Sequence, residues 1–176
     1  MLEKDNRFKL LKPFFNNPTG KFHIRELSRL TGLSLPAVSS ILKKLESEKI
    51  LKSERGKAVL NYYPDFDGGE FFPLKRFFNL YMLQRSGLVS EIVRKYNEPE
   101  AVVLFGSYSR GEDTIKSDVD LAIVTKRSIE FSAKKFEGIL GRKINIHDVD
   151  LSKSNPEFLN DLANGVVLSG YLRALR

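Results

Sequence analysis

The chain has 176 residues and a mass of 20.1 kDa, enough for one large domain or two small ones. Hydrophobic residues make up 41% of it and charged residues 29%, which excludes a disordered protein and predicts a soluble globular one. No apolar run approaches the ~20 residues of a membrane span, and the N-terminus lacks the apolar core of a secretory signal. We therefore expect a cytoplasmic protein without membrane contact. The absence of cysteine excludes disulfides and thiolate ligands, so any metal should be held mainly by oxygen.

The net charge of +7 is confined to the first third of the chain. Residues 1–63 carry 13 lysines and arginines against 6 acidic residues, whereas residues 97–176 carry 11 against 12. A basic surface on one domain is typical of a protein that neutralises nucleic-acid phosphates. A merely solvated basic face is the alternative.

The first third shows three helical patterns followed by a hairpin. Apolar residues at helical spacing predict helices over about 8–16, 24–31 and 35–46. Ser34 can cap the third helix, whose outer face carries small or hydroxyl side chains and then two lysines. Two short strands, 50–54 and 58–63, flank a glycine turn with a cation on each side.

This order of elements resembles a winged helix-turn-helix DNA-binding domain, and the stretch HIRELSRLTGLSLPAVSSILKKLESEKIL carries the resemblance. The resemblance implies that the third helix reads the major groove of double-stranded DNA and that the hairpin contacts phosphates or the minor groove. A winged helix that binds a protein instead is the alternative. The expected DNA-binding residues are Ser34, Pro36, Ser39, Ser40, Lys43, Lys44, Arg55 and Lys57.

The middle of the chain is helical and rich in aromatic residues. Turn residues at 65–69 end the first domain. Large apolar residues crowd positions 71–83, which predicts a helix that is buried on every side, and a second helix follows over about 86–96. This segment either packs between the two domains or forms the interface of a homodimer, which two-fold DNA sites favour.

A glycine, a serine and two aspartates carry the chemistry of the C-terminal half. The apolar run 101–105 predicts a buried strand, and Gly106 and Ser107 follow it where a helix starts, a turn that suits a phosphate. A second strand, 117–124, contains Asp118 and Asp120, which alternation places on one face. Carboxylates this close predict a divalent cation, Mg²⁺ or Mn²⁺. The alternative is a pair of surface aspartates on an edge strand.

The stretch LFGSYSRGEDTIKSDVDLAIV is similar to the polymerase-beta-type nucleotidyltransferases, above all their small archaeal and bacterial members, over about residues 100–170. The resemblance implies that Gly106 and Ser107 hold a nucleoside triphosphate. It also implies that Asp118 and Asp120 bind metal ions for displacement at the α-phosphorus with release of pyrophosphate. Arg110 is either a phosphate ligand or a solvated helix cation.

A third carboxylate of that family stands on a later strand. Here an amphipathic helix over about 129–140 precedes the strand 144–148, in which Asn145 takes the position. Asparagine can ligate a metal through its carbonyl oxygen but cannot act as a base or supply negative charge, which weakens the expectation of catalysis. His147 shares the expected face and can substitute as ligand or base, whereas Asp148 should point away. A short helix with Pro156 near its start follows.

The sequence thus predicts an α/β (α+β) chain of three parts. These are a winged helix domain at 1–65, a helical linker or dimerisation segment at 66–97, and a nucleotidyltransferase domain with a mixed sheet flanked by helices at 98–176. The expected function is metal-dependent transfer of a nucleoside monophosphate to an unknown acceptor, which can be a protein. The alternative is an antitoxin-like DNA-binding transcription regulator whose second domain binds a nucleotide, or a protein such as a partner toxin, with little or no catalysis.

Overall fold

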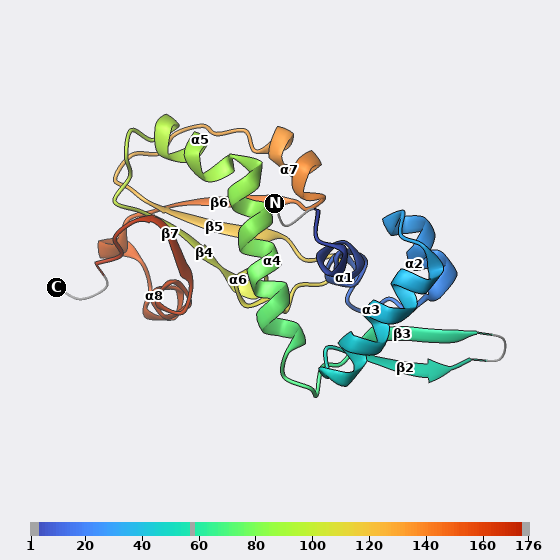
Figure 1. Ribbon diagram of the computed structural model, residues 1–176. Coiled ribbons are helices and arrows are strands. Elements are labelled where there is room, and N and C mark those ends of the chain that lie inside the picture. Colours follow the sequence, from blue (N-terminus) through green and yellow to red (C-terminus); the bar gives the residue numbers. More distant parts are fainter. Residues whose placement is uncertain (1–3, 57–58, 174–176) are drawn as a thin grey trace. The chain divides into compact units, whose positions relative to one another are not determined.

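The computed structural model describes residues 4–56 and 59–173. The chain divides into two compact units, residues 1–75 and 76–176 (Figure 1). It contains helices and two sheets, so the predicted mixture of α and β structure is confirmed. Lys57, one of the predicted DNA-binding residues, lies outside the described residues. Within the described part, no helix is long and apolar enough to cross a membrane.

The first unit combines three helices with a small antiparallel sheet. The three predicted helices and the hairpin are present, and the sheet also contains a two-residue strand that the pattern did not indicate. Ser34 caps the third helix, because its hydroxyl accepts a hydrogen bond from the backbone N–H of Ala37 at 3.4 Å. The elements are α1 (Asn6–Asn16), β1 (Phe22–His23), α2 (Ile24–Thr31), α3 (Leu35–Ser47), β2 (Leu51–Arg55) and β3 (Leu60–Pro64), with strand order β1-β3-β2.

One apolar core holds this unit together. Leu10 and Phe14 of α1, Leu27 of α2 and Leu42 of α3 are each fully buried. Full burial of such a side chain contributes about 1.5–3 kcal/mol, which is why the helical spacing of these residues predicts the helices correctly.

Two helices follow β3. α4 (Phe71–Ser86) contains the boundary between the units, and α5 (Leu88–Lys95) begins after Gly87, which takes the left-handed conformation. The prediction that the first of these helices is buried on every side is wrong, because Phe77 is 54% exposed. α4 packs on the second unit's core through Leu80 and Leu83, and Phe77 lies outside that contact.

The second unit is built on a four-stranded mixed sheet with the order β6-β5-β4-β7. β5 pairs antiparallel with β4 and parallel with β6, in agreement with the predicted mixed sheet. The strands are β4 (Ala101–Phe105), β5 (Val119–Val124), β6 (Ile144–Val149) and β7 (Val166–Gly170). The remaining helices are α6 (Gly106–Arg110), α7 (Lys134–Leu140), the 3-10 turn Leu151–Lys153 and α8 (Pro156–Ala163).

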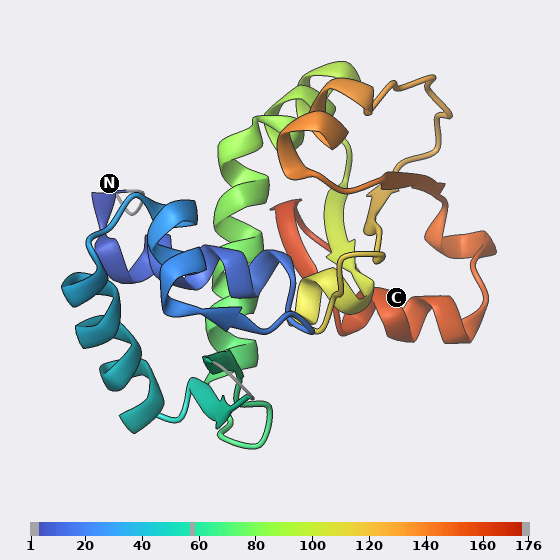
Figure 2. The ribbon, with the colours of Figure 1, turned by 90° about the vertical axis from the view of Figure 1, so that its right-hand side faces the viewer.

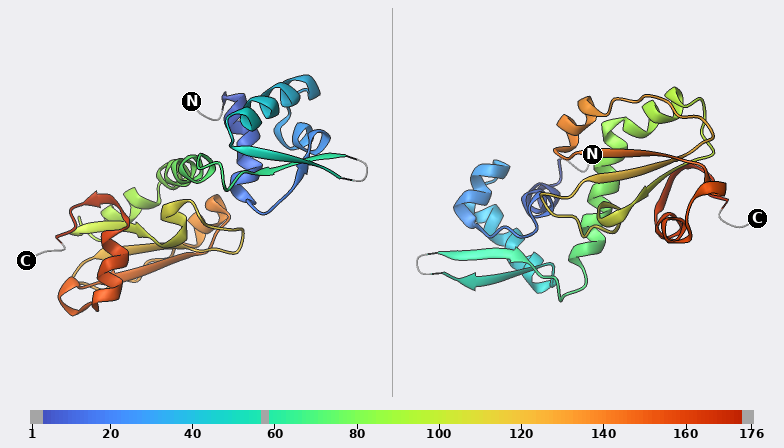
Figure 3. Two further views of the ribbon diagram at one scale, coloured as in Figure 1. Left: turned by 90° about the horizontal axis from the view of Figure 1, so that it is seen from below. Right: turned by 180° about the vertical axis from the view of Figure 1, so that it is seen from behind.

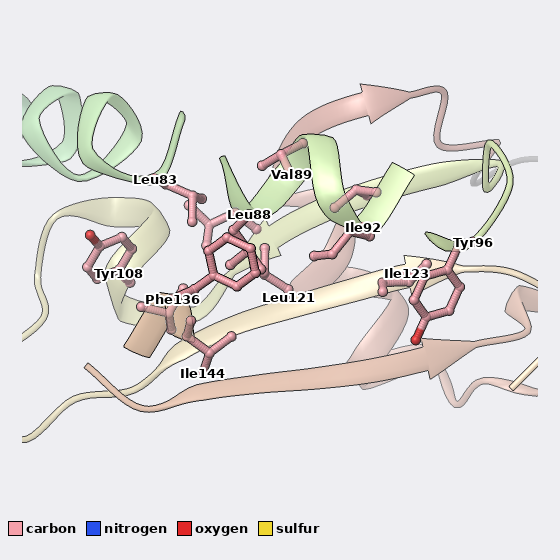
Figure 4. Packing of buried hydrophobic residues seen from close by; sticks show 13 residues of the cluster. Leu83, Leu88, Val89, Ile92, Tyr96, Tyr108, Leu121, Ile123, Phe136 and Ile144 are labelled. Carbon is pink, nitrogen blue, oxygen red and sulfur yellow. The ribbon is translucent and has the colours of Figure 1, made fainter. Parts of the chain in front are cut away.

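Helices cover both faces of this sheet (Figures 2 and 3). α5 and α7 pack on one face, where Ile92 and Phe136 meet Leu121 of the central strand (Figure 4). α8 packs on the other face through Phe158 and Leu162. Because side chains alternate along a strand, Asp120 points to the α8 face while its neighbour Leu121 points to the opposite core.

Two predicted boundaries differ from the structure. β5 begins at Val119 rather than 117, so Asp118 precedes the strand. The helix predicted from about 129 begins only at Lys134. The backbone N–H of Ile129 donates to Asp148 Oδ2 on β6 at 3.2 Å, and this tertiary contact fixes the segment as irregular chain rather than helix.

Candidate functional site

Gly106 directly follows β4 and lies close to Asp120, near the start of the neighbouring strand β5. Its φ of +73° lies in the left-handed region, and a Cβ at this position would stand 3.0 Å from Asp120 Oδ2. Both facts require glycine. Ser107 follows in α6, which therefore starts directly beside the carboxylate of Asp120.

Asn145 joins the two predicted aspartates. Parallel pairing of β5 with β6 puts Asn145 opposite Asp120. The side-chain Nδ2 of Asn145 donates to Asp120 Oδ1 at 2.9 Å and to Asp118 Oδ2 at 3.1 Å. The structure thus brings Asp118, Asp120 and Asn145 into one cluster, although Asp118 lies just outside the strand.

The charge of this cluster is negative and weakly compensated. Lys143 Nζ lies 3.8 Å from Asp118 Oδ2, but the lysine side chain is 69% exposed, so the pair contributes at most about 1 kcal/mol. Two half-buried carboxylates held around one amide favour a cation between them.

The donor set of the cluster fits a hard divalent cation. Within the described ranges, no group of three or more histidine or acidic side chains is arranged to hold a metal. Two carboxylates are present, and the Asn145 carbonyl oxygen can replace its amide nitrogen by a rotation of the side-chain amide. Three oxygen ligands, with water or phosphate oxygens completing the shell, suit Mg²⁺ or Mn²⁺.

His147 lies two residues after Asn145 and therefore on the same face of β6. Its ring lies 5.6 Å from that of Phe105 and 6.4 Å from that of Phe158. In the strand register it faces Ala122, not Asp120, so it borders the cluster without joining it. Asp148 points to the opposite face, as predicted, and accepts a hydrogen bond from the Tyr96 hydroxyl at 2.7 Å.

Arg110 ends the short helix α6. Its Nε lies 2.7 Å from Glu112 Oε2, and the two side chains are about half exposed. The guanidinium therefore already has an anionic partner at the surface near the turn. An exposed pair of this kind is worth little, so it can be exchanged for another anion at small cost.

Sequence patterns do not indicate three polar residues near the site, Asn79, Asp113 and Arg142. Asn79 of α4 donates through Nδ2 to Asp113 Oδ1 at 2.6 Å, and Arg142 Nη2 lies 3.4 Å from Asp113 Oδ2. Burial, and then the charge of Asp113, raise the pKa of the nearby Tyr108. No pattern in the sequence distinguishes these polar residues from ordinary surface residues, because only the folded chain buries them.

The predicted DNA-binding residues of α3 share one side of that helix. Val38, Leu42 and Leu45 point into the core of the first unit. The opposite side presents Pro36, Ser39, Ser40, Lys43 and Lys44, of which only Ser39 is half-buried, next to the cap residue Ser34. Arg55 is exposed at the end of β2.

Residues 88–170 match the family model described as "Polymerase beta, Nucleotidyltransferase", which supports a nucleotidyltransferase fold for this part of the chain. The matched region runs from α5 to the end of β7 and includes the glycine turn and both aspartates. A search of curated proteins found no match to this chain.

Proposed function

We propose that the second unit binds a nucleoside triphosphate together with a divalent cation and transfers the nucleoside monophosphate to a hydroxyl of another molecule. The observation that carries the proposal is the contact of one Asn145 amide with both Asp118 and Asp120, beside the turn at Gly106 and Ser107. A nucleotidyltransferase fold over residues 88–170 supports the same conclusion.

Each part of the cluster has a role in this reaction. Gly106 lets the backbone approach closely, and the Ser107 hydroxyl and N–H suit the triphosphate. Asp118, Asp120 and the Asn145 carbonyl oxygen would hold the cation. When bound, the cation would offset the charge of the triphosphate, which two carboxylates alone would repel.

The transfer step is a displacement at phosphorus. The acceptor hydroxyl oxygen bonds to the α-phosphorus while the bond from that phosphorus to the bridging oxygen breaks. Pyrophosphate leaves, and the hydroxyl proton passes to water. Asn145 cannot take this proton, because its amide is not basic.

The neutral amide at position 145 favours a second candidate function, a domain that binds nucleotide and cation with little or no turnover. Asn145→Asp separates the two. If the amide only slows proton removal, the added carboxylate should increase transfer at least about tenfold, as a positioned general base does. If the domain is a pure binding module, the variant should show no transfer.

Labelling of an acceptor tests the proposed transfer. The full chain is incubated with α-labelled nucleoside triphosphates, Mg²⁺ or Mn²⁺ and cell extract. We expect label on an acceptor that is lost in Asp118→Asn and Asp120→Asn. It should be retained in Asp161→Asn, which makes the same chemical change at an exposed aspartate of α8 outside the cluster. Label that is independent of Asp118 and Asp120 would contradict the proposal.

We also propose that the first unit is a winged helix that binds double-stranded DNA. Three helices followed by a β-hairpin, with the exposed Lys43 and Lys44 on the outer side of α3 and Arg55 on β2, support it. The excess of positive charge lies in the same part of the chain. Lysines on such a face neutralise phosphates and release counterions.

The salt dependence of DNA binding tests this second proposal. For the double variant Lys43→Gln/Lys44→Gln, we expect the slope of log affinity against log salt to fall by about two, one for each phosphate contact. The matched control is Lys134→Gln/Lys135→Gln, an adjacent pair of exposed lysines on α7. DNA binding that ignores salt, or equal slopes for the two double variants, would contradict a phosphate-contacting role of α3.

A further inference from the structure

A buried polar cluster lies beside the loop 112–117, which joins the turn at Gly106 and Ser107 to Asp118. Its members are Asn79 on α4, Asp113 in the loop after α6, and Arg142 in the turn after α7. Asp113 is 1% exposed, Asn79 is 2% exposed, and the Arg142 side chain is 8% exposed. Burying charged groups is unfavourable unless they are paired and hydrogen-bonded, so the contacts within the cluster decide its role.

Asn79 connects α4 both to α6 and to the loop after it. Its Nδ2 donates to Asp113 Oδ1 at 2.6 Å and to the backbone carbonyl of Tyr108 at 3.0 Å. Tyr108 is the residue after Ser107. One amide group therefore connects α6, which contains Gly106 and Ser107, to the loop that follows it.

Arg142 connects the same loop to the start of β6. Its Nη2 lies 3.4 Å from Asp113 Oδ2, and its Nη1 donates to the carbonyl oxygen of Ile115 at 2.8 Å. The neighbouring carbonyl of Lys143 accepts a hydrogen bond from Val119 at 2.8 Å. This backbone contact lies next along the strands to the pairing of Asp120 with Asn145.

We propose that Asp113 and Arg142 are positioning residues that hold the loop 112–117 in one conformation and thereby set the place of Asp118 relative to Ser107 and Asp120. This inference rests on the proposed function. The loop offers little apolar burial of its own, since Thr114, Ile115 and Lys116 are exposed. Polar contacts must then supply its order.

This role differs from general stabilisation of the second unit. The two apolar clusters of the sheet are formed by other residues, so the sheet should persist when the Asp113 contacts are weakened. Asp113→Asn preserves the size of the side chain and removes its charge. Arg142→Gln removes the guanidinium from the other side of the same contact.

Hydrogen exchange of the folded full chain tests the inference directly. In Asp113→Asn and in Arg142→Gln, we expect backbone amides of residues 112–118 to exchange at least about tenfold faster, with strands β4 and β5 unchanged. The increase in exchange rate in the double variant should be smaller than the product of the two single increases, because both changes break the contact between Asp113 and Arg142. The control Arg94→Gln, which breaks an exposed ion pair of α5, should resemble the wild type. Unchanged exchange of residues 112–118 in both single variants would overturn the inference.

Mn²⁺ affinity, measured by electron paramagnetic resonance, tests the consequence for the site. We expect about tenfold weaker binding in Asp113→Asn and Arg142→Gln, as for other groups that orient metal ligands. Arg142→Lys should lie between these variants and the wild type, because it keeps the charge but cannot reproduce the forked donor geometry. It also provides a mild variant should Arg142→Gln fail to fold.

The two measurements separate the failure of this inference from that of the proposed function. A wild type that binds Mn²⁺ while Asp113→Asn and Arg142→Gln bind it equally well would overturn the inference. A wild type that binds no Mn²⁺ would contradict the proposed function, and the exchange rates of residues 112–118 would then decide the inference alone.

Discussion

Asn145 is the residue on which the proposed chemistry of the second unit depends. Its amide lies between two carboxylates that would otherwise repel each other, and it donates one hydrogen bond to each. The same amide adds no negative charge and cannot remove a proton. Under the proposed function, the site would hold a cation and a triphosphate without a third carboxylate to activate the acceptor.

Replacing Asn145 by aspartate should make the stability of the second unit dependent on the cation. Without Mg²⁺, Asn145→Asp loses two hydrogen bonds and adds a third carboxylate, so we expect the free energy of unfolding to fall by about 1–3 kcal/mol. Excess Mg²⁺ should restore most of this loss. Thermal unfolding with and without the cation measures both effects.

Asn164→Asp is the matched control, since it makes the same chemical change at an exposed residue that ends α8 and is not part of the cluster. It removes one hydrogen bond, from the Asn164 side chain to the carbonyl oxygen of Asn160 at 2.8 Å, so it should lower stability by up to about 1 kcal/mol, and Mg²⁺ should not restore the loss. Equal stability of Asn145→Asp and the wild type in the absence of Mg²⁺ would show that the amide does not separate the carboxylates.

Gly106 should tolerate no side chain. Gly106→Ala places a residue with a Cβ at a φ of +73° and brings that atom to 3.0 Å from Asp120 Oδ2. We expect a loss of about 1–3 kcal/mol in unfolding by urea, together with weaker Mn²⁺ binding, because the carboxylate must move.

Gly138→Ala provides the comparison for Gly106→Ala. This glycine lies inside α7, and a Cβ there would have no neighbour within 4 Å. The substitution should leave Mn²⁺ binding unchanged and raise stability by up to about 1 kcal/mol. A similar cost for both alanines would contradict a special role of the turn at Gly106.

The residues that could be predicted from the sequence are those whose signal is local. Gly106 and Ser107 follow an apolar strand, Asp118 and Asp120 are two residues apart, and Asn145 stands between two isoleucines. Asp113 and Arg142 give no such signal. They are 29 residues apart, and their pairing depends on how α7 returns the chain to the sheet.

Among the elements, the turn after β3 shows how one carboxylate can organise a segment. Asp65 Oδ1 accepts hydrogen bonds from the backbone N–H groups of Asp67 and Gly68 at 3.0 and 2.9 Å. Lys52 Nζ lies 2.9 Å from the same oxygen. The hydrogen bond from Lys52 lowers the pKa of Asp65, and the backbone donors act in the same direction against desolvation.

This lowered pKa predicts the acid response of the first unit. The folded state favours the charged carboxylate, so the stabilisation is present above the ordinary aspartate pKa of about 3.9 and is lost as the pH falls through the lower folded value. Asp65→Asn should therefore flatten the loss of stability as the pH falls below the ordinary aspartate pKa of about 3.9. Denaturation followed through NMR signals of residues 4–56 measures it.

Asp67→Asn is the control for the turn. Its carboxylate pairs with the same Lys52 at 2.7 Å but is 89% exposed, so water screens the pair and it should contribute little to stability. If Asp65→Asn and Asp67→Asn had the same acid profile, the turn would not depend on the buried carboxylate.

Most helices and strands follow from local periodicity, and the exceptions have tertiary causes. The spacing of apolar residues places α1, α2 and α3 closely, because each buries one stripe in a single core. The start of α7 could not be read in the same way. Ile129 is apolar and at helical spacing, yet its backbone is bound to Asp148 on β6.

At the scale of the whole molecule, charge is divided between regions of the chain. The basic excess lies within residues 1–63, whereas residues 97–176 are close to neutral and include the two aspartates of the cluster. A phosphate backbone and a triphosphate both carry negative charge. Lysines can neutralise a phosphate backbone directly. A triphosphate beside Asp118 and Asp120 would need a cation between it and these carboxylates.

The most direct test of the central claim is a crystal structure of the full chain with Mn²⁺ and a nonhydrolysable nucleoside triphosphate. We expect anomalous density for Mn²⁺ between Asp118 and Asp120, the Asn145 carbonyl oxygen turned toward it, and the triphosphate against Gly106 and Ser107. Mn²⁺ or triphosphate bound elsewhere, with the Asn145 amide still donating to both carboxylates, would contradict it.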